Sequence, residues 1–330
     1  KFASGTLPLT PNDLSNSNII IDESSSYMMG TPLDKGYKAV QWNSPVDENG
    51  NKIPTELKSH PDNMKNFVQT GITSINGISL ANRSEKLHYR FSYSNLSNKG
   101  IIPNSDLFRN TINFNTTAQI SDKVSLGVNL DASRNNSNNR PAGDRGTNPH
   151  QAAYEVPSHV NILDLKDYWV PGQEGLQQLS TSPGSKNNPY FLAYGVNNSF
   201  VRDRVFGNVH LDWKITENWD AMIRYATDVY WEKRETKIPL SYNDEPNGSY
   251  GIVNITNMEQ NVDFLTTYKK QVNDFHFSGS VGGNMRYYKG TSVNNSSKNG
   301  VGLITSGVYS LSNIAPASLN YSSYLSQKGV

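Results

Sequence analysis

Residues 86–135 decide the fold, and they read KLHYRFSYSNLSNKGIIPNSDLFRNTINFNTTAQISDKVSLGVNLDASRN. Within this stretch, polar residues alternate with more apolar ones in three successive runs. The more apolar positions are Leu87, Tyr89, Phe91 and Tyr93, then Ile112, Phe114, Thr116, Ala118 and Ile120, then Val124, Leu126, Val128, Leu130 and Ala132. Such a period of two places one set of side chains on each face of a β-sheet. The stretch therefore predicts three strands with one apolar face and one polar face.

The connections between the predicted strands alternate in length along the chain. Long connections are predicted at 97–108, 136–199, 243–248 and 291–330, and short turns at 121–123, 216–218 and 272–274. Outer-membrane barrels have short turns at one end and long loops at the other. A β-sandwich also alternates, but loops of comparable length lie at both of its ends. The alternation of short and long connections in this chain therefore favours the barrel over the sandwich.

The composition agrees with a chain of strands and loops. Hydrophobic residues make up 35% of the 330 residues and the mean hydropathy is −0.62, yet aromatic residues reach 10%. The net charge of +1 gives no electrostatic case for a nucleic-acid partner. The chain has no cysteine, which excludes a disulfide scaffold and Cys-based zinc sites. No apolar run is long enough for a transmembrane helix. This does not exclude a membrane barrel, because barrel strands are short and alternate polar with apolar residues, so they contain no such run.

We expect an all-β fold, an antiparallel up-and-down meander of about eight strands, divided into three regions. Residues 1–65 are irregular in sequence, 66–290 carry the strands, and 291–330 form a polar tail without a strong period. The first strand is predicted at 66–81. The chain begins at Lys1 without the basic and apolar segments of a signal peptide, and we expect it to be an internal piece of a longer protein.

Two groups of side chains are candidates for function. The first group occupies the polar face by parity and consists of His88, Arg90, Arg204, His210, Asp212 and Arg224. A metal site would need the histidines to converge with second-shell partners, so hydrated side chains in a polar interior are the simpler interpretation. Asp212 and Asp228 are likewise interpreted as charges on a wet face and not as a catalytic pair. We expect no metal, no cofactor and no enzymatic activity.

The second group consists of aromatic residues in the long connection 136–199. Its members are Tyr154, Tyr168, Trp169, Tyr190, Phe191 and Tyr194. Aromatic rings beside Asn and Gln suit the stacking of sugar rings and the binding of their hydroxyl groups. The alternative is that these rings pack the loop onto itself or onto a partner protein.

A series of short motifs occurs in a fixed order from residue 82 onward. The motifs are NRSEK (82–86), YRFSY (89–93), KGIIPNS (99–105), RN (109–110), DKVSLG (122–127), NVDF (261–264), FHFS (275–278) and GVYSLSN (307–313). Together they resemble the SusC/RagA-type TonB-dependent outer-membrane transporters, and the resemblance extends over most of the chain from about residue 66.

This resemblance implies a barrel of about 22 strands that is plugged by an N-terminal domain. The 330 residues would supply one arc of the barrel, without the plug, the energy-coupling box or the remaining strands. The implied function is the import of oligosaccharides, peptides or other nutrients through the outer membrane of a Gram-negative bacterium. The implied partners are a SusD-like surface lipoprotein that acts as a lid, the TonB complex through the missing N-terminal region, and outer-membrane lipid. The predicted long loops, and residues 1–65 and 291–330, would be extracellular.

Two other classes of protein share parts of this pattern. A secreted β-rich adhesin or carbohydrate-binding module would have a dry inner face and no aromatic bands. A passive porin would have the same wall but would need no plug. A plug domain encoded upstream of Lys1 would favour the transporter.

Overall fold

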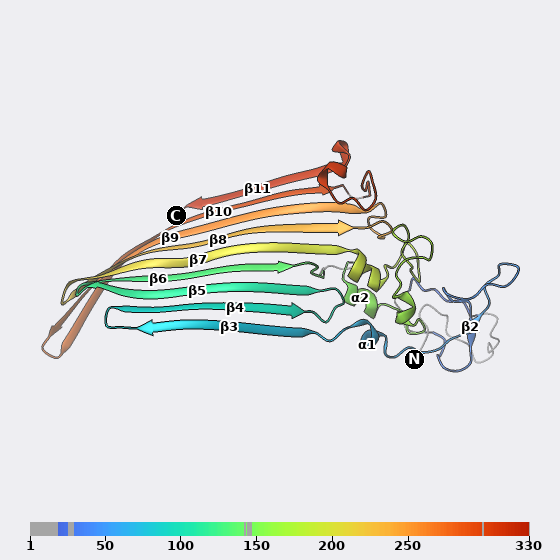
Figure 1. The fold of residues 1–330 in the computed structure, drawn as a ribbon, viewed down its shortest axis with the longest axis horizontal. Coiled ribbons are helices and arrows are strands. Elements are labelled where there is room, and N and C mark those ends of the chain that lie inside the picture. Colours follow the sequence, from blue (N-terminus) through green and yellow to red (C-terminus); the bar gives the residue numbers. More distant parts are fainter. Residues whose placement is uncertain (1–18, 26–29, 142, 144–146, 299, 330) are drawn as a thin grey trace.

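The computed structural model describes residues 19–25, 30–141, 143, 147–298 and 300–329. Its main element is one antiparallel sheet of nine strands in which every strand pairs with its neighbours in the sequence (Figure 1). The strands are β3 (Ile72–Arg83), β4 (Leu87–Lys99), β5 (Asp106–Ser121), β6 (Val124–Ser137), β7 (Asn197–Thr216), β8 (Trp219–Ile238), β9 (Ser249–Val272), β10 (Phe275–Ser297) and β11 (Leu319–Gly329). The predicted all-β, up-and-down meander is confirmed.

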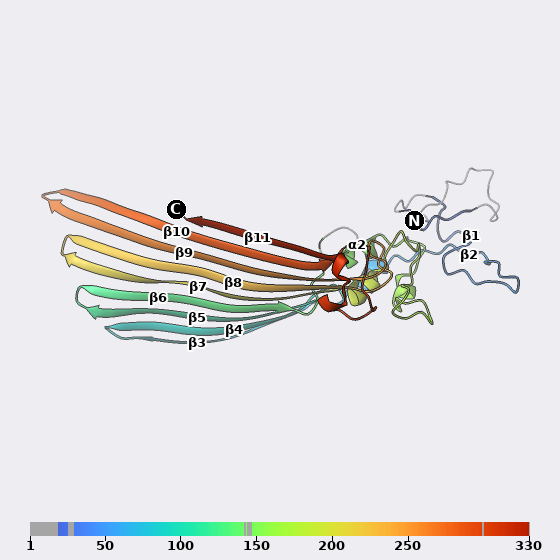
Figure 2. The ribbon, with the colours of Figure 1, turned by 90° about the horizontal axis from the view of Figure 1, so that it is seen from above.

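The sheet is curved and open, and its two ends differ (Figure 2). The strands meet in short turns at one end, whereas long loops and all the helical turns gather at the other (Figure 1). The predicted short turns are present between β5 and β6, β7 and β8, and β9 and β10. In the last of these, Asn273 has a φ of 53°, a left-handed conformation that asparagine tolerates. The strand β3 forms one free edge of the sheet and β11 forms the other.

The remaining elements are short. They are β1 (Lys38–Ala39), β2 (Thr55–Glu56), α1 (Asn63–Phe67), α2 (Pro149–Tyr154), the 3-10 turns η2 (Ile162–Leu165), η4 (Leu311–Asn313) and η5 (Pro316–Ser318), and the π-helical turn η3 (Phe191–Gly195). β1 and β2 pair with each other in a separate two-stranded ladder. Among the described residues, no helix has the length and apolar character needed to cross a membrane.

The hydrophobic core lies among the loops and at the loop ends of the strands. One cluster joins Phe67 of α1 to Ile162, Leu165 and Tyr190 of the long loop, and all four side chains are at most 3% exposed. A second cluster is centred on Phe191, which is fully buried. Each of these clusters brings together residues far apart in the sequence, so the loop end folds as one packed unit.

The first strand begins later than predicted. Residues 66–71 were expected to be extended, but α1 occupies Asn63–Phe67 and β3 starts at Ile72. The helical turn places Asn63 and Phe67, four residues apart, on the same side, and both are buried against the long loop. Tertiary packing therefore overrides the weak alternation of these residues.

The polar tail predicted at 291–330 contains strand, so that prediction was wrong. β10 continues to Ser297, and β11 pairs with it along its whole length. The sheet has nine strands where about eight were expected, and its second edge is β11 and not β10. The segment is largely polar and its alternation is weak, with Leu319, Tyr321 and Leu325 on one face but Tyr324 on the other, so the ladder with the neighbouring strand decides its conformation. The connection predicted at 97–108 is also shorter, because β4 ends at Lys99 and β5 begins at Asp106.

Candidate functional site

The register of the sheet aligns apolar side chains across strands. Residues directly opposite each other in an antiparallel pair share a face. Leu126 lies opposite Leu211, Leu211 opposite Ile223, and Ile223 opposite Phe264. Ile223 and Phe264 remain 54% and 53% exposed. The sequence-predicted apolar face thus exists as a continuous surface over β6–β9, and no part of the described chain covers it.

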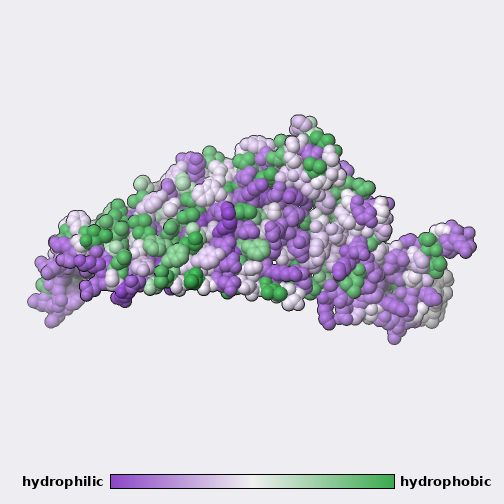
Figure 3. All heavy atoms as spheres, viewed as in Figure 1, coloured by the Kyte–Doolittle hydropathy of each residue, from purple (hydrophilic) through white to green (hydrophobic). Residues whose placement is uncertain are grey.

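The apolar face forms a band of limited height. Along β7 it runs from Trp213 to Val205, which is about 26 Å of strand at ~3.3 Å per residue. A tilt of about 40°, as in outer-membrane barrels, reduces this height to about 20 Å, close to the ~25 Å apolar band of such barrels. Beyond the band on the same face, Arg134 and Asp203 form an ion pair with N–O distances of 2.7 and 2.8 Å. Figure 3 shows hydrophobic residues gathered over the half of the sheet nearer the short turns.

Aromatic side chains mark the border of the band at the short turns. Trp219 lies opposite Tyr268 and donates its indole N–H to the Thr266 hydroxyl at 2.6 Å. Trp213, on the other side of the same turn, is 47% exposed. Rings that combine an apolar body with a polar edge suit the boundary between apolar and aqueous surroundings.

The opposite face carries all six predicted polar residues. Arg204, His210 and Asp212 are on alternating positions of β7, and the register pairs His210 with Arg224. His88 and Arg90 lie on the same face of β4, three strands away from β7 and four from β8. This shared face agrees with the parity expected from the sequence.

Cross-strand ion pairs join charged residues of this polar face. The pairs are Arg204–Asp228, Arg224–Asp263 and Arg286–Glu259, together with Glu232, which lies between Arg202 and Arg234. The Glu232 side chain is 1% exposed, and its two arginine neighbours compensate its buried charge. The exposed pairs contribute little stability individually, but each fixes a long side chain against the sheet. The result is a charged surface of ion-paired side chains.

Glycine allows one of the candidate residues to lie flat on this surface. The imidazole of His210 crosses over β6 at Gly127, where a Cβ atom would be 2.1 Å from the ring. His210 also lies 3.6 Å from the Asp212 carboxylate. A larger residue at position 127 would push the ring away from the sheet.

Some aromatic residues of the long loop are buried and others are exposed. Tyr190 and Phe191 are 3% and 0% exposed, so in this structure they pack the loop onto itself. The ring centroids of Trp169 and Phe191 are 5.4 Å apart, and those of Tyr168 and Tyr194 are 6.3 Å apart in a stacked arrangement. The exposed member of the second pair, Tyr194, is 46% accessible.

Tyr154, at the end of α2, is 73% exposed. A role in substrate or lid contact therefore stays a prediction, and it applies best to Tyr154 and Tyr194.

Two buried amides, which the sequence analysis missed, hold the long loop in shape. The Asn188 side chain donates to the carbonyls of Leu165 and Leu179, both at 2.8 Å, and it accepts from the N–H groups of Tyr190 and Phe191. Gln178 accepts from the N–H of Asn188 at 2.8 Å. The only signal in the sequence is the Asn-Pro dipeptide at 188–189, which is typical of a turn or a helix start.

Further asparagines attach the loop to the sheet. The side-chain amides of Asn104 and Asn139 both donate to the carbonyl of Ala193, at 3.0 and 3.1 Å. Asn139 also accepts from the N–H of Asn198, at the start of β7. Because these contacts involve the ends of β5, β6 and β7, the loop cluster is held at a fixed place on the rim.

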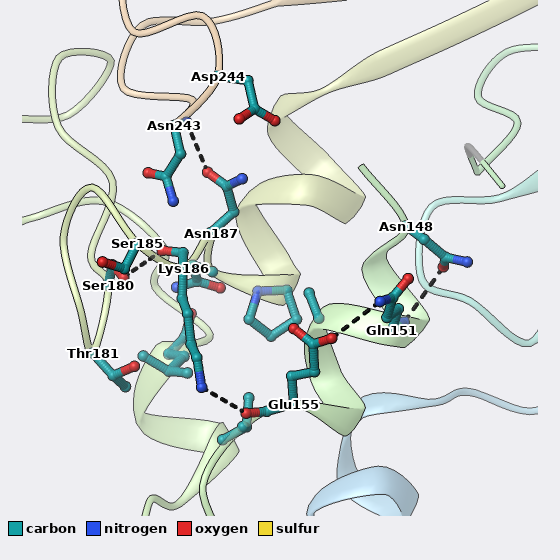
Figure 4. Close-up of a pocket in the computed structure, with 15 residues that line it drawn as sticks. Asn148, Gln151, Glu155, Ser180, Thr181, Ser185, Lys186, Asn187, Asn243 and Asp244 are labelled. Carbon is teal, nitrogen blue, oxygen red and sulfur yellow. Dashed lines mark hydrogen bonds between the residues drawn. The ribbon is translucent and has the colours of Figure 1, made fainter. Parts of the chain in front are cut away.

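The loop cluster contains a polar cavity of about 140 Å³ (Figure 4). Its walls come from α2, from the segment around residues 180–189, and from the connection between β8 and β9. Most of its lining residues are polar, among them Asn148, Gln151, Glu155, Ser180, Thr181, Ser185, Lys186, Asn187, Asn243 and Asp244, although carbon atoms supply slightly more of its surface than polar atoms do. The Glu155 carboxylate accepts from Gln151 at 3.0 Å on one wall.

Lys186 is the single cation in the lining of this cavity. Its ammonium group donates to the backbone carbonyls of Ser25 at 2.9 Å and Glu155 at 3.4 Å. Burial lowers the pKa of Lys186 from its ordinary value, although Glu155 and Asp22 act in the opposite direction. The ammonium is thus used to join the loop to the segment that contains Ser25.

Within the described residues, no group of three or more His, Asp or Glu side chains is arranged to hold a metal ion. His88 and His210 lie on different strands of the polar face, with β5 and β6 between them. The histidine at 276 lies on β10, at the far side of the sheet.

Comparisons with known proteins give matches at the level of structure. No protein-family model matches the chain, and a search of curated proteins found no match either. The RagAB peptide importer in its closed-closed state superposes with a TM-score of 0.66 and 18% identity, over 90% of this chain and 32% of the other. A second structure, of the RagAB peptide transporter, gives a TM-score of 0.63 and 17% identity, over 81% of this chain and 30% of the other.

The chain thus spans about a third of the length of the chains that it matches. These matches support the resemblance drawn from the motifs, at the level of the fold. The nine-stranded open sheet has the fold of part of the barrel of RagA, a SusC/RagA-type TonB-dependent transporter.

Proposed function

We propose that this chain forms part of the barrel wall of a TonB-dependent nutrient importer in the outer membrane of a Gram-negative bacterium. The observation that carries the proposal is a single sheet with an uncovered apolar band on one face and ion-paired polar residues on the other. A wall of this kind separates lipid from a water-filled interior. The fold match to part of RagA supports the same assignment.

In this proposal the polar face lines the lumen and the short turns lie in the periplasm. The loop cluster then lies outside the cell, where it meets nutrients and a surface lipoprotein of the SusD type. The name of the matched complex, RagAB, supports a two-protein assembly. Tyr154 and Tyr194 are the candidate contact residues, because they combine large rings with exposure.

The secreted binding module is disfavoured by the uncovered band. Ile223, Phe264 and Met285 are each more than half exposed, whereas a secreted protein would cover such side chains with a second layer. The passive porin has the same two-sided wall, and a transport experiment must separate it from the importer.

The test uses the full-length protein in its own host. Outer membranes of the parent strain and of a deletion strain are probed for the protein, and uptake of labelled oligosaccharide and peptide mixtures is followed with and without a protonophore. The proposal expects the protein in the outer-membrane fraction and uptake that requires both the gene and the proton gradient. Uptake that survives the protonophore would identify a passive porin, and protein found only in the medium would identify a secreted module.

A further inference from the structure

A row of four cations ends the apolar face on the side of the loops. The strands β4, β6, β8 and β10 all run from the short turns toward the loops (Figure 1). On each of them, the first charged side chain that follows the turn on the apolar face is a cation. The four are Lys99, Arg134, Lys233 and Lys289, and all of them are exposed.

The height of this row fits the border of a membrane. Each cation lies 10–14 residues beyond the first residue of its strand. This separation is about 33–46 Å along the strand at ~3.3 Å per residue. A strand tilt of about 40° reduces it to roughly 25–35 Å, and the hydrocarbon core of a bilayer is about 30 Å thick. In a membrane wall, the row is therefore level with the lipid headgroups of the leaflet on the loop side.

Two of the four cations face an acid on the neighbouring strand. Arg134 forms an ion pair with Asp203 of β7. Lys99 lies directly opposite Asp106 in the register of β4 and β5. Opposite charges offset each other at both positions, so the surface over β4–β7 has little net attraction for an anion.

The other two cations, Lys233 and Lys289, have no acid opposite them. They lie on either side of β9, where Lys233 is opposite Asn254 and Lys289 is opposite Met258. No acidic residue occurs on this face of β9 at any point along the strand. Neither lysine forms an ion pair with another described residue. Both ammonium groups are thus available to an external anion.

The nearest acid along β8 is already engaged. Glu235, two residues beyond Lys233 on the same face, forms an ion pair with Lys237 at 3.5 Å. It also accepts a hydrogen bond from the Tyr250 hydroxyl. Because Lys237 offsets the charge of Glu235, this end of β8 remains positive on the apolar face.

An aromatic ring accompanies each of the two free lysines. Trp231 precedes Lys233 by two residues on the same face, and Tyr287 precedes Lys289 in the same way. Such rings favour the headgroup level of a membrane, where a lysine extends its ammonium group toward the polar side. Thr256 lies opposite Trp231 on β9, midway between the partners of the two lysines, and its hydroxyl can donate to a headgroup oxygen. We call these five residues the lysine patch.

We propose that the lysine patch binds the phosphate groups of an anionic lipid in the outer leaflet. Any membrane wall touches lipid, and the patch adds selectivity for lipids by their phosphate charge. The register places Lys233 and Lys289 two strands apart and four residues apart along β9, so their Cα atoms are separated by about 16 Å. Each lysine can then bind a separate phosphate, and a headgroup with two phosphates gains from both. The inference rests on the proposed membrane wall and names a lipid partner for it.

The test is native mass spectrometry of the full-length protein in detergent. The probe is lipid A that carries two, one or no phosphate groups, so that differences in affinity report the phosphates. One lysine near a membrane surface changes the affinity for an anionic lipid about fivefold. The parent protein should bind the bisphosphorylated probe about fivefold more tightly than the monophosphorylated probe, and the unphosphorylated probe about fivefold more weakly again.

Single variants tie these differences to the two lysines. In Lys233→Gln and in Lys289→Gln one free cation remains, so the bisphosphorylated and monophosphorylated probes should bind equally, and the unphosphorylated probe should still bind more weakly. The double variant should bind all three probes equally. The matched control is Lys214→Gln, which removes an exposed lysine from the polar face and should keep the preferences of the parent. Heat-modifiable mobility on gels checks that each variant assembles.

Four results would overturn the inference. They are equal binding of the three probes by the parent, a phosphate preference that the double variant keeps, loss of the preference in Lys214→Gln, and displacement of the bisphosphorylated lipid by millimolar inorganic phosphate. The last result would identify a site for free anions. None of them touches the importer, because uptake and its dependence on the proton gradient are measured separately. Uptake that survives the protonophore would instead remove the importer and leave the phosphate preference in place.

Discussion

At the residue scale, neighbouring positions on one strand have opposite environments. Val128 lies opposite Val209 at the middle of the apolar band, whereas Asn129 lies opposite Asn208 on the polar face. This contrast follows from the pleat of a strand, which sends successive side chains to opposite faces. It also gives a direct way to test whether the apolar face meets lipid.

We expect Val128→Arg to destabilise the full-length barrel by about 2–4 kcal/mol, because a charged side chain near the bilayer midplane is costly. Asn129→Arg, one residue away, should cost little since its side chain stays in water. The measurement is the free energy of unfolding in lipid vesicles, supported by the fraction of protein that assembles in the outer membrane. Equal losses at both positions would argue against a membrane wall.

His159 is a buried histidine in the loop cluster whose surroundings disfavour its protonated form. Its side chain is 3% exposed, and neither ring nitrogen has a hydrogen-bond partner among the described residues. Burial, with smaller contributions from His60 and Lys186, lowers the pKa of His159 to about 4 from 6.5. The unfolded loop therefore binds a proton more readily than the folded loop does.

We expect the loop cluster to lose stability as the pH falls from about 6.5 to about 4, and to be insensitive to this group above 6.5. The loss is at most about 3.5 kcal/mol, at ~1.4 kcal/mol for each pH unit between 6.5 and 4. The measurement is thermal unfolding of the loop, reported by a fluorophore on Leu176→Cys, an exposed position in a chain without cysteine. His159→Phe should remove this part of the pH dependence, and an unchanged profile would refute the assignment.

At the element scale, the strands and the long loop are separately organised. The strands are held by their ladders, whereas the loop has its own core and is attached to the rim by Asn104 and Asn139. Loops on a rigid scaffold commonly carry function, because their sequence can vary without loss of the scaffold.

We expect that replacing residues 138–196 by a short flexible linker leaves barrel assembly intact but impairs nutrient uptake and capture of the surface lipoprotein. The β6 and β7 ladders lie outside the deleted range, so their hydrogen bonds persist. Heat-modifiable mobility on gels reports assembly, and growth on the nutrient together with co-purification of the lipoprotein reports function. If uptake and co-purification were both unchanged, the loop would have no part in transport.

At the scale of the whole molecule, the sheet is incomplete by itself. β3 and β11 leave rows of unpaired N–H and C=O groups, and the apolar band has no covering layer in the described part of the chain. Chain entropy is offset only when apolar area leaves water, and here much of it stays exposed.

The 330 residues expressed alone should therefore associate in aqueous buffer and disperse only in detergent. Sedimentation velocity with and without detergent measures this. A monomer that melts cooperatively in detergent-free buffer would contradict the membrane wall and favour a secreted binding module.

The sequence by itself determined most of the sheet. Alternation between residues 86 and 135, and again along β7 and β8, set the strands and their faces, because the pleat has a period of two. The three short turns and the shared face of Arg204, His210 and Arg224 follow from the same pattern.

Only the tertiary structure decided the second edge of the sheet and the packing of the loop cluster. β11 and the end of β10 are largely polar and alternate only weakly, and they become strands through the ladder that joins them. The helix α1 and the burial of Tyr190 depend on packing between segments about 120 residues apart, which no local pattern encodes. Asn188 looks like any other asparagine in an Asn-rich chain, and its importance comes from four hydrogen bonds that exist only in the folded loop.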